Sequence, residues 1–302
     1  AVFGTYNPPA AADLLEPIFG LEWDPKIDEF ERQIISESLS TIPKIPGERS
    51  ATIKWSTELK GSGVAGTPPA HLGVPLKGCG MAETIVALTS VEYLPQSFGQ
   101  DSLSLEIRET DDSGSCVRKR IAGARGTFGI KADKGKPVTI DFEFTGKYFE
   151  PDDTAGPLTP SPGPGLTPLP FLGVSFSFAG IGTLLIQQVE LDIKNNVSLR
   201  NDINDASGNI GAVITSRAPS GKINPEETLV ATFNPWARWT GVTLGALTYT
   251  LGSIAGNIVT VSAPKTQITK VGDGDRDQIA IEDLELLLTK NLGDDEIRVF
   301  FT

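Results

Sequence analysis

Residues 51–148 and 212–302 carry the same succession of patterns, and this repetition constrains the fold more than any other feature. Each segment has a strand-like run, a Gly/Pro-rich loop with one short helix, a hairpin, a turn and a closing strand. The hairpins and closing strands are 103–121 with 138–145 in the first segment and 247–261 with 279–289 in the second. A period this long is not that of a solenoid; it indicates two sister domains and favours a symmetric assembly with half the usual number of chains.

The predicted strands alternate between apolar and polar side chains. In 51–59, Ile53 and Trp55 lie on one side while Lys54 and Ser56 lie on the other, and 138–145 alternates in the same way. Period two over this length is typical of a half-buried strand in an antiparallel sheet with one apolar and one polar face. The predicted fold is therefore mainly β, with one short helix per domain.

The chain divides into four regions. Residues 1–50 form an N-terminal arm with the first strands, in which Ile27–Leu39 is either a short amphipathic helix or an irregular arm. Residues 51–150 are domain 1, and 171–302 are domain 2. The segment 151–170 holds seven of the 22 prolines, which favours an extended linker.

Smaller features complete the prediction of local structure. The two helices are expected near Pro69–Lys77 and Pro235–Thr240, and Asn195-Asn196 is a candidate tight turn because Asn tolerates a positive φ. The alternation slips at Glu282-Asp283, which suggests a β-bulge. Residues 297–301 end the chain as a short strand.

Charge and composition exclude several classes of protein. With 302 residues and a net charge of −12, the chain is a poor candidate for tight nucleic-acid binding, although solubility alone also explains such a charge. The sequence contains no run of 18 apolar residues, so no membrane span is predicted, and the first residues lack a signal-peptide profile. Cys79 and Cys116 are expected to be buried thiols of a reducing compartment, and not a disulfide.

Gly61-Ser62-Gly63-Val64-Ala65-Gly66 matches the G-x-G-x-x-G pattern of dinucleotide sites. Such a site needs a helix that begins inside the motif, whereas Thr67-Pro68-Pro69 intervenes before the predicted helix. The segment is therefore interpreted as a flexible loop, and no cofactor is expected.

Two further patterns are weak candidates for chemistry. Asp273, Asp275 and Asp277 are spaced like calcium ligands, but Gln278 and Leu284 stand where an EF-hand needs Gly and Glu. His71 is the single histidine, interpreted as a surface residue without a recognisable nucleophile motif. The sequence predicts neither a metal site nor an enzyme.

Five segments together resemble major tail tube proteins of long-tailed bacteriophages. The resemblance covers most of the chain after about residue 50, and it depends on the order and spacing of Ile53–Gly63, Pro69–Gly80, Ile121–Thr127, Val189–Arg200 and Thr215–Gly221.

The resemblance implies a structural protein of the virion. Tail tube proteins stack as rings whose strands form a continuous β-barrel around a channel, and most have one domain per chain in rings of six. Two tail-tube domains per chain, 51–150 and 171–302, then imply a trimeric, pseudo-hexameric ring with about 24 inner strands; an outward-decorating second half would instead give a hexamer. The implied partners are further copies of the chain, the tape-measure protein, the tail terminator and tail-tip proteins, and DNA as transient cargo during ejection. No membrane partner is expected, and assembly takes place in the host cytoplasm.

An acidic lumen would keep DNA from adhering to the wall. The lumen candidates face solvent or a neighbouring ring in the alternative interpretation, and they are Asp141, Glu143, Glu282 and Glu285. The candidates for contacts between rings lie in a loop and are Gly61, Ser62, Gly63, Gly66 and Thr67, with 157–170 and 1–50 as further segments. A competing hypothesis is a binding or adhesion module made of two β-sandwiches, which predicts a secretion signal and a soluble monomer. A third is an enzyme that uses the Gly61–Gly66 loop or His71.

Overall fold

A computed structural model describes residues 3–10, 13, 15, 19–35, 38, 40–154, 156 and 166–302. The chain is mainly antiparallel β-structure with one short helix in each half of the described chain, which confirms the predicted fold class. The first half contains β1 (Phe19–Phe30), β2 (Ile45–Glu58), α1 (Ala70–Gly78), β3 (Met81–Val86), β4 (Ser90–Pro95), β5 (Leu103–Thr110), β6 (Cys116–Asp133) and β7 (Thr139–Thr154). The second half contains β8 (Ser175–Phe178), β9 (Gln188–Asp192), β10 (Asn195–Asn201), β11 (Asn209–Arg217), β12 (Ser220–Ile223), α2 (Pro235–Thr240), β13 (Gly245–Leu251), β14 (Val259–Arg276), β15 (Ile279–Thr289) and β16 (Arg298–Phe301).

The two predicted hairpins, the two closing strands, both helices and the terminal strand are confirmed. α2 has the predicted bounds: the Asn234 side chain accepts a hydrogen bond from the Ala237 N–H, and Pro235 occupies the first turn. α1 begins directly after Pro69, and the N–H groups of Leu72 and Gly73 donate to the Pro69 carbonyl.

The structure corrects three local predictions. The segment Ile27–Leu39 contains no helix among its described residues: β1 pairs with β2 as far as Phe30, residues 31–35 are irregular, and Leu39 lies outside the described residues. Asn195 and Asn196 begin β10, and the positive φ of this corner belongs to Lys194, at 45°.

The predicted bulge is also misplaced. Glu282 and Asp283 pair regularly with β14, and the register shift lies on β14 itself, between Ile268 and Lys270. The slip in the pattern has another cause: Ile281 and Glu282 are both buried because the segment after β12 hydrogen-bonds to this end of β15, where the Glu282 N–H donates to the Pro225 carbonyl.

The central sheet repeats one strand order. Its main run is β1-β2-β7-β6-β9-β12-β15-β14, with every neighbouring pair antiparallel. The order β1-β2-β7-β6 in the first half recurs as β9-β12-β15-β14 in the second. β5 lies beside the first part of β6 as β13 lies beside the first part of β14.

The run has one apolar and one polar face. The apolar face packs against α1 and the strands beyond β14, and Trp55 stacks on Phe142 and Phe144 with ring centroids 5.2 and 5.4 Å apart. Its buried side chains come from both halves and include Ile53, Phe128, Ile130, Ile140, Val189, Leu191, Leu284 and Leu286. The alternation predicted from the sequence therefore holds across the boundary between the halves.

Two contacts join the halves into one sheet. β6 pairs with β9, and β4 pairs with the C-terminal strand β16, where Tyr93 packs edge-on against Phe301. Part of the predicted linker, Pro151–Thr154, belongs to β7, and 155 and 157–165 lie outside the described residues. The boundary at 151–170 stays a prediction.

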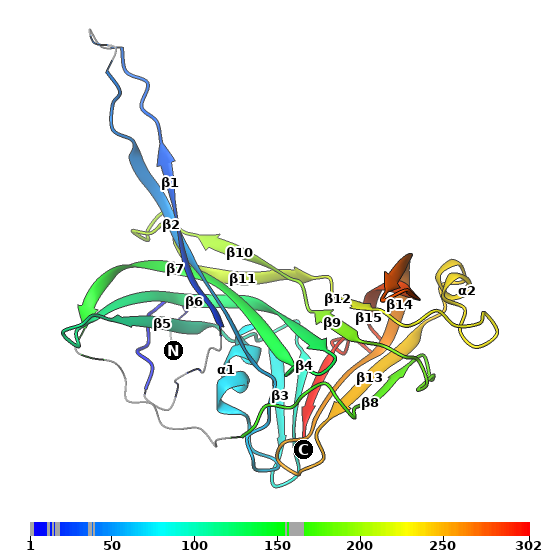
Figure 1. Cartoon of the computed structure of the whole chain (residues 1–302). Coiled ribbons are helices and arrows are strands. Elements are labelled where there is room, and N and C mark those ends of the chain that lie inside the picture. Colours follow the sequence, from blue (N-terminus) through cyan, green and yellow to red (C-terminus); the bar gives the residue numbers. More distant parts are fainter. Residues whose placement is uncertain are drawn as a thin grey trace.

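Two hairpins extend beyond the run (Figure 1). The β1–β2 hairpin projects away from the body of the molecule as an arm, and the β10–β11 hairpin lies across the first half. The second hairpin is anchored there by Asn209, whose side-chain amide donates to the Arg49 carbonyl at 2.9 Å, and by an ion pair between Lys147 and Asp205. The arm has no such partner in the described part of a single chain apart from its own strands and residues near its base.

The β14–β15 turn yields a stability prediction. Asp277 and Gln278 have φ values of 54° and 68°, the two positive angles of a type I′ hairpin turn. A left-handed conformation costs a non-glycine residue about 1 kcal/mol, and Asn-Gly is the preferred pair here. We expect Asp277→Asn with Gln278→Gly to raise the free energy of unfolding by about 1 kcal/mol, measured by chemical denaturation of the unassembled protein. Gln278→Ala, which keeps the strain, is the control; an unchanged or lower midpoint for the Asn-Gly variant contradicts the prediction.

Candidate assembly surface

The polar face of the eight-strand run carries charged side chains on neighbouring strands. We define the polar face as the side chains that point away from the core on β2, β7, β6, β9, β12, β15 and β14: Lys54, Ser56, Asp141, Glu143, Lys131, Glu190, Asp192, Lys222, Asp283, Glu285 and Lys270. Their positions follow from the antiparallel register, in which directly opposed residues share a face.

Carboxylates and lysines alternate across this surface and pair. Lys131 Nζ lies 2.7 Å from Asp141 Oδ2, and the Ser56 hydroxyl donates to the same carboxylate. Lys54 Nζ lies 3.5 Å from Glu143 Oε2. In the second half Lys270 Nζ lies 3.0 Å from Glu285 Oε1. The polar face therefore has mixed charge, although the chain as a whole is acidic.

The pairing changes the proton affinities of these groups. The hydrogen bond from Lys131 to Asp141 raises the pKa of the lysine, and the hydrogen bond from Lys270 lowers the pKa of Glu285. At Asp192 burial is the main influence and raises the carboxyl pKa, although the Lys194 N–H donates to it. The paired lysines have fewer donors left for a phosphate backbone than free lysines would have.

Three of the four lumen candidates lie on the polar face. Asp141, Glu143 and Glu285 do, whereas Glu282 points to the core side of β15 and is 2% exposed. Its position on the polar face is taken by the adjacent residue, Asp283, which is exposed. Sequence reasoning misplaced Glu282 because the alternation of β15 could be extended in either phase through two successive buried residues.

Glu282 occupies a core position with a titratable group. Burial, followed by the nearby charges of Glu227 and Asp273, raises its pKa to about 7. Its Oε2 atom is buried without a hydrogen-bond partner. The cation of this region, Arg276, forms its ion pair with Glu226 instead.

The run ends in two open strand edges. β1 hydrogen-bonds to β2 on one side only, and residues 270–276 of β14 hydrogen-bond to β15 on one side only, within the described chain. β1 also exposes apolar side chains, among them Leu21, Ile27 and Phe30 at 50%, 43% and 60%. Unpaired edges of this length favour pairing with another chain.

The candidate loop for contacts between rings is partly used inside the chain. Gly61 is buried: its N–H donates to the Asn257 side chain at 2.8 Å, and the Gly63 N–H donates to the Gly256 carbonyl at 3.0 Å. A Cβ on Gly61 would lie 2.1 Å from that carbonyl oxygen, so only glycine fits. Ser62, Gly66 and Thr67 remain partly or fully exposed, and their contact with another ring stays a prediction.

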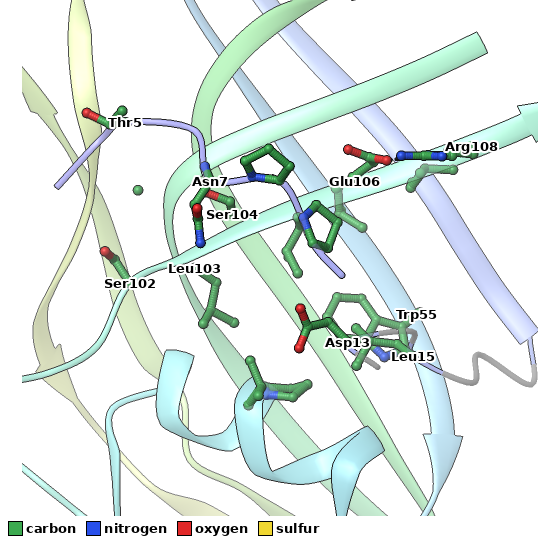
Figure 2. Close-up of a pocket in the computed structure, with 18 of the residues that line it drawn as sticks. Thr5, Asn7, Asp13, Leu15, Trp55, Ser102, Leu103, Ser104, Glu106 and Arg108 are labelled. Carbon is green, nitrogen blue, oxygen red and sulfur yellow. Dashed lines mark hydrogen bonds and ion pairs between the residues drawn. The ribbon is translucent and has the colours of Figure 1, made fainter. Parts of the chain in front are cut away.

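A cavity of about 480 Å³ lies between the N-terminal segment, β5 and α1 (Figure 2). The polar groups that line it are hydrogen-bonded: the Arg108 guanidinium donates to Glu106, which also accepts from the nearby Tyr6 hydroxyl, and the Asn7 N–H donates to the Ser104 hydroxyl at 3.1 Å. These contacts hold the N-terminal segment against β5. His71, which a Ser-His or Cys-His site would require, does not line this cavity.

The remaining candidates have structural surroundings. His71 is buried at 8% exposure, and not at the surface as predicted; a ring nitrogen lies 3.2 Å from the Glu58 carbonyl oxygen. Cys79 and Cys116 are buried free thiols, as predicted, and burial raises the pKa of Cys79. Asp273, Asp275 and Asp277 lie along the end of β14 and its turn, and no group of metal-ligating side chains is found among the described residues.

The comparisons with known proteins point to one family. The family model of the phage tail tube protein matches residues 1–286. No curated protein matches the chain. Among the described residues, no helix has the length and apolar character needed to cross a membrane.

Glu282 gives a prediction on pH dependence. Its pKa is raised from 4.5 in the unfolded chain to about 7 in the fold, so ionisation of Glu282 destabilises the folded state relative to the unfolded state. The stabilising effect of the neutral form is fully present below pH 4.5 and is lost as the pH rises through 7, a difference of about 3 kcal/mol. We expect Glu282→Gln to unfold at a higher denaturant concentration than the parent at pH 8 and at a similar one at pH 5. Asp283→Asn, on the other face of the same strand, is the control; a gain for Glu282→Gln that is equal at both pH values contradicts the assignment.

Proposed function

The chain belongs to the phage tail tube protein family, whose role is structural, and we propose that three copies close into a ring whose stacked repeats conduct DNA into the host. The observation that carries this proposal is the eight-strand run with two open edges. A sheet with an apolar and a polar face removes its edges most completely by closing on itself. Three runs of eight strands supply about 24, enough for a barrel with an open channel.

We infer that the two halves are sister tail-tube domains. The recurring strand order supports this interpretation, because an order of four strands with the same flanking strand is repeated in sequence. A chain with two such domains fills a sixfold pattern with three copies, since each domain takes one of six places.

The polar face is the proposed lumen wall. The apolar face is covered by the chain itself, which leaves the polar face as the side that water and a duplex can reach. Its carboxylates, Asp141, Glu143, Asp283 and Glu285 among them, repel phosphates, while lysines such as Lys131 and Lys270 are paired within the protein. A duplex then passes without forming the salt-sensitive contacts that hold DNA on a basic surface.

The remaining parts of the proposal follow from a tube in a virion. The tape-measure protein occupies the lumen before DNA does, tail terminator and tail-tip proteins bind the ends, and assembly takes place in the host cytoplasm. The role requires no catalysis, and the hydrogen bonds of Tyr6 and Asn7 beside the cavity hold the N-terminal segment against β5. Normal tubes from His71→Ala would remove the remaining catalytic hypothesis.

Ring size is tested on the purified protein. We expect native mass spectrometry of rings, with negatively stained micrographs of the same sample, to give three full-length chains per ring and hollow tubes. A ring of six full-length chains contradicts the trimer, and a stable monomer that forms no tubes favours the adhesion module instead.

The lumen assignment is tested by access to one side chain. Glu143 is exposed on the polar face, and both native thiols are buried, so Glu143→Cys provides a single reactive thiol. We expect it to react with small and with bulky polymer-linked maleimides before assembly, but in long tubes only with the small reagent. Equal reaction with the bulky reagent in tubes and in unassembled protein would place Glu143 outside the lumen.

A further inference from the structure

The two halves can be superposed residue by residue through their strand registers. Thr52 pairs with Asp24 on one side and Thr145 on the other, and Ser220 pairs with Asp192 and Leu287. Aligning Thr52 with Ser220 therefore aligns three strands at once.

This alignment brings identical residues together that the sequence alone does not align. On β1 and β9, Glu22-Trp23-Asp24-Pro25-Lys26 matches Glu190-Leu191-Asp192-Ile193-Lys194. On the other two strands and the bridge that follows β12, the identical pairs are Lys54 with Lys222, Glu58 with Glu226, Asp141 with Asp283, and Glu143 with Glu285. Most of these side chains belong to the polar face or its continuation on β1.

The junction between the halves shows how one such unit meets the next. β6 pairs with β9 so that Gly129 opposes Asp192 and Lys131 opposes Glu190. The Ile193 N–H donates to the Phe128 carbonyl, which makes the neighbouring Gly129–Asp192 pair a non-hydrogen-bonded one with closely spaced side chains.

The open edges are the counterparts of this junction. β14 corresponds to β6, because Gly272 opposes Asp283 as Gly129 opposes Asp141. β1 corresponds to β9, as the Glu-x-Asp-x-Lys match shows. One copy therefore carries an unused β6-like edge at one end and an unused β9-like edge at the other.

We propose that β14 of one copy pairs antiparallel with β1 of a second copy, in the register that places Gly272 opposite Asp24, as Gly129 lies opposite Asp192 within the chain. This rests on the proposed ring and specifies its interface. The contact is head-to-tail, so that repetition closes a ring without two-fold axes in its plane.

Further features of β1 agree with this partner. Pro25 is the counterpart of Ile193, whose N–H donates to β6 at the junction between the halves. Because proline has no N–H, the contact between copies has one hydrogen bond fewer. A proline on the outer side of an edge strand also discourages unspecific pairing before assembly. By the same correspondence, the β1–β2 arm lies across the second half of the neighbouring copy as the β10–β11 hairpin lies across β6 and β7, and this contact covers the exposed Phe30.

The register is tested with paired cysteines. Six strands separate β1 from β14 within one chain, so a disulfide between Asp24→Cys and Gly272→Cys has to join two copies. A non-hydrogen-bonded antiparallel pair has a Cα separation of about 4.5 Å, within the range that a disulfide spans. A Cβ on Gly272 meets its nearest neighbour at 3.7 Å, so this substitution fits. The control is Glu22→Cys with Gly272→Cys, displaced by two residues to more than about 7 Å, beyond disulfide reach.

We expect tubes of the matched pair, mildly oxidised, to give mostly cross-linked species on a non-reducing gel, at least about tenfold more than the displaced pair, as the geometry requires. The ladder should end at the ring size. Tubes that form normally but cross-link equally weakly with both pairs, or better with the displaced pair, overturn the interface and leave the tube function intact. Failure of the parent protein to form tubes would instead overturn the proposed function.

Discussion

Unpaired backbone groups along two strand edges are the constraint on which the rest of this structure depends. Every N–H and C=O along β1 and the end of β14 that finds no partner in the chain must be met by water or by another strand. A long open sheet is prone to unspecific association, and a closed one is not. The two strand edges that stay unpaired in a single chain are the edges that could pair with neighbouring copies in the wall of a tube.

The division of the sheet into two faces supports the same interpretation. Trp55, Phe142 and Phe144 hold the apolar face, and burial of aromatic side chains of this size is among the largest stabilising contributions available to a domain. The other face is held by ion pairs such as that of Lys54 with Glu143, which contribute little to stability when exposed. We therefore interpret the charged residues of the polar face as serving the proposed passage of DNA more than the stability of the fold.

Glu282 is the exception to this division, and its position is informative. It stands where the first half has buried Ile140, and it lies next to the open end of β14. Inward-pointing charges and prolines at edges are two of the means by which natural sheets avoid premature pairing. Pro25 on the edge strand β1 fits that role, and Glu282 on β15, beside the open end of β14, places an inward-pointing charge next to the other edge.

Much of the fold was accessible from the sequence because period-two alternation is strong in 51–59 and 138–145, and because Pro235 marks the start of a helix. The misplaced features have local causes. Asn195 has the residue type of a turn, but the corner lies one residue earlier, at Lys194, whose N–H donates to the Asp192 side chain at the end of β9. The N-terminal arm was predicted, but the position of β1 within it was not, because Pro25 interrupts the usual signal of a strand. Proline is tolerated at this position because the missing N–H would face away from β2. The residue-by-residue repeat is not visible in the sequence because two different offsets relate the halves. β1 and β2 align with β9 and β12 at an offset of 168 residues, as the pair Thr52–Ser220 shows. β5, β7 and the start of β6 align with β13, β15 and the start of β14 at an offset of 142, as the pair Thr145–Leu287 shows. The ion pairs of the polar face join residues of different strands, so they can be predicted only once the register between those strands is known.

The most direct test of the central claim is a cryo-electron microscopy reconstruction of tubes grown from the purified protein, at a resolution that separates strands. The account predicts an unbroken wall in which β1 of each chain runs beside β14 of its neighbour, with Asp141 and Asp283 facing the channel. A wall in which those two edges stay apart, or in which the polar face points outward, would contradict it.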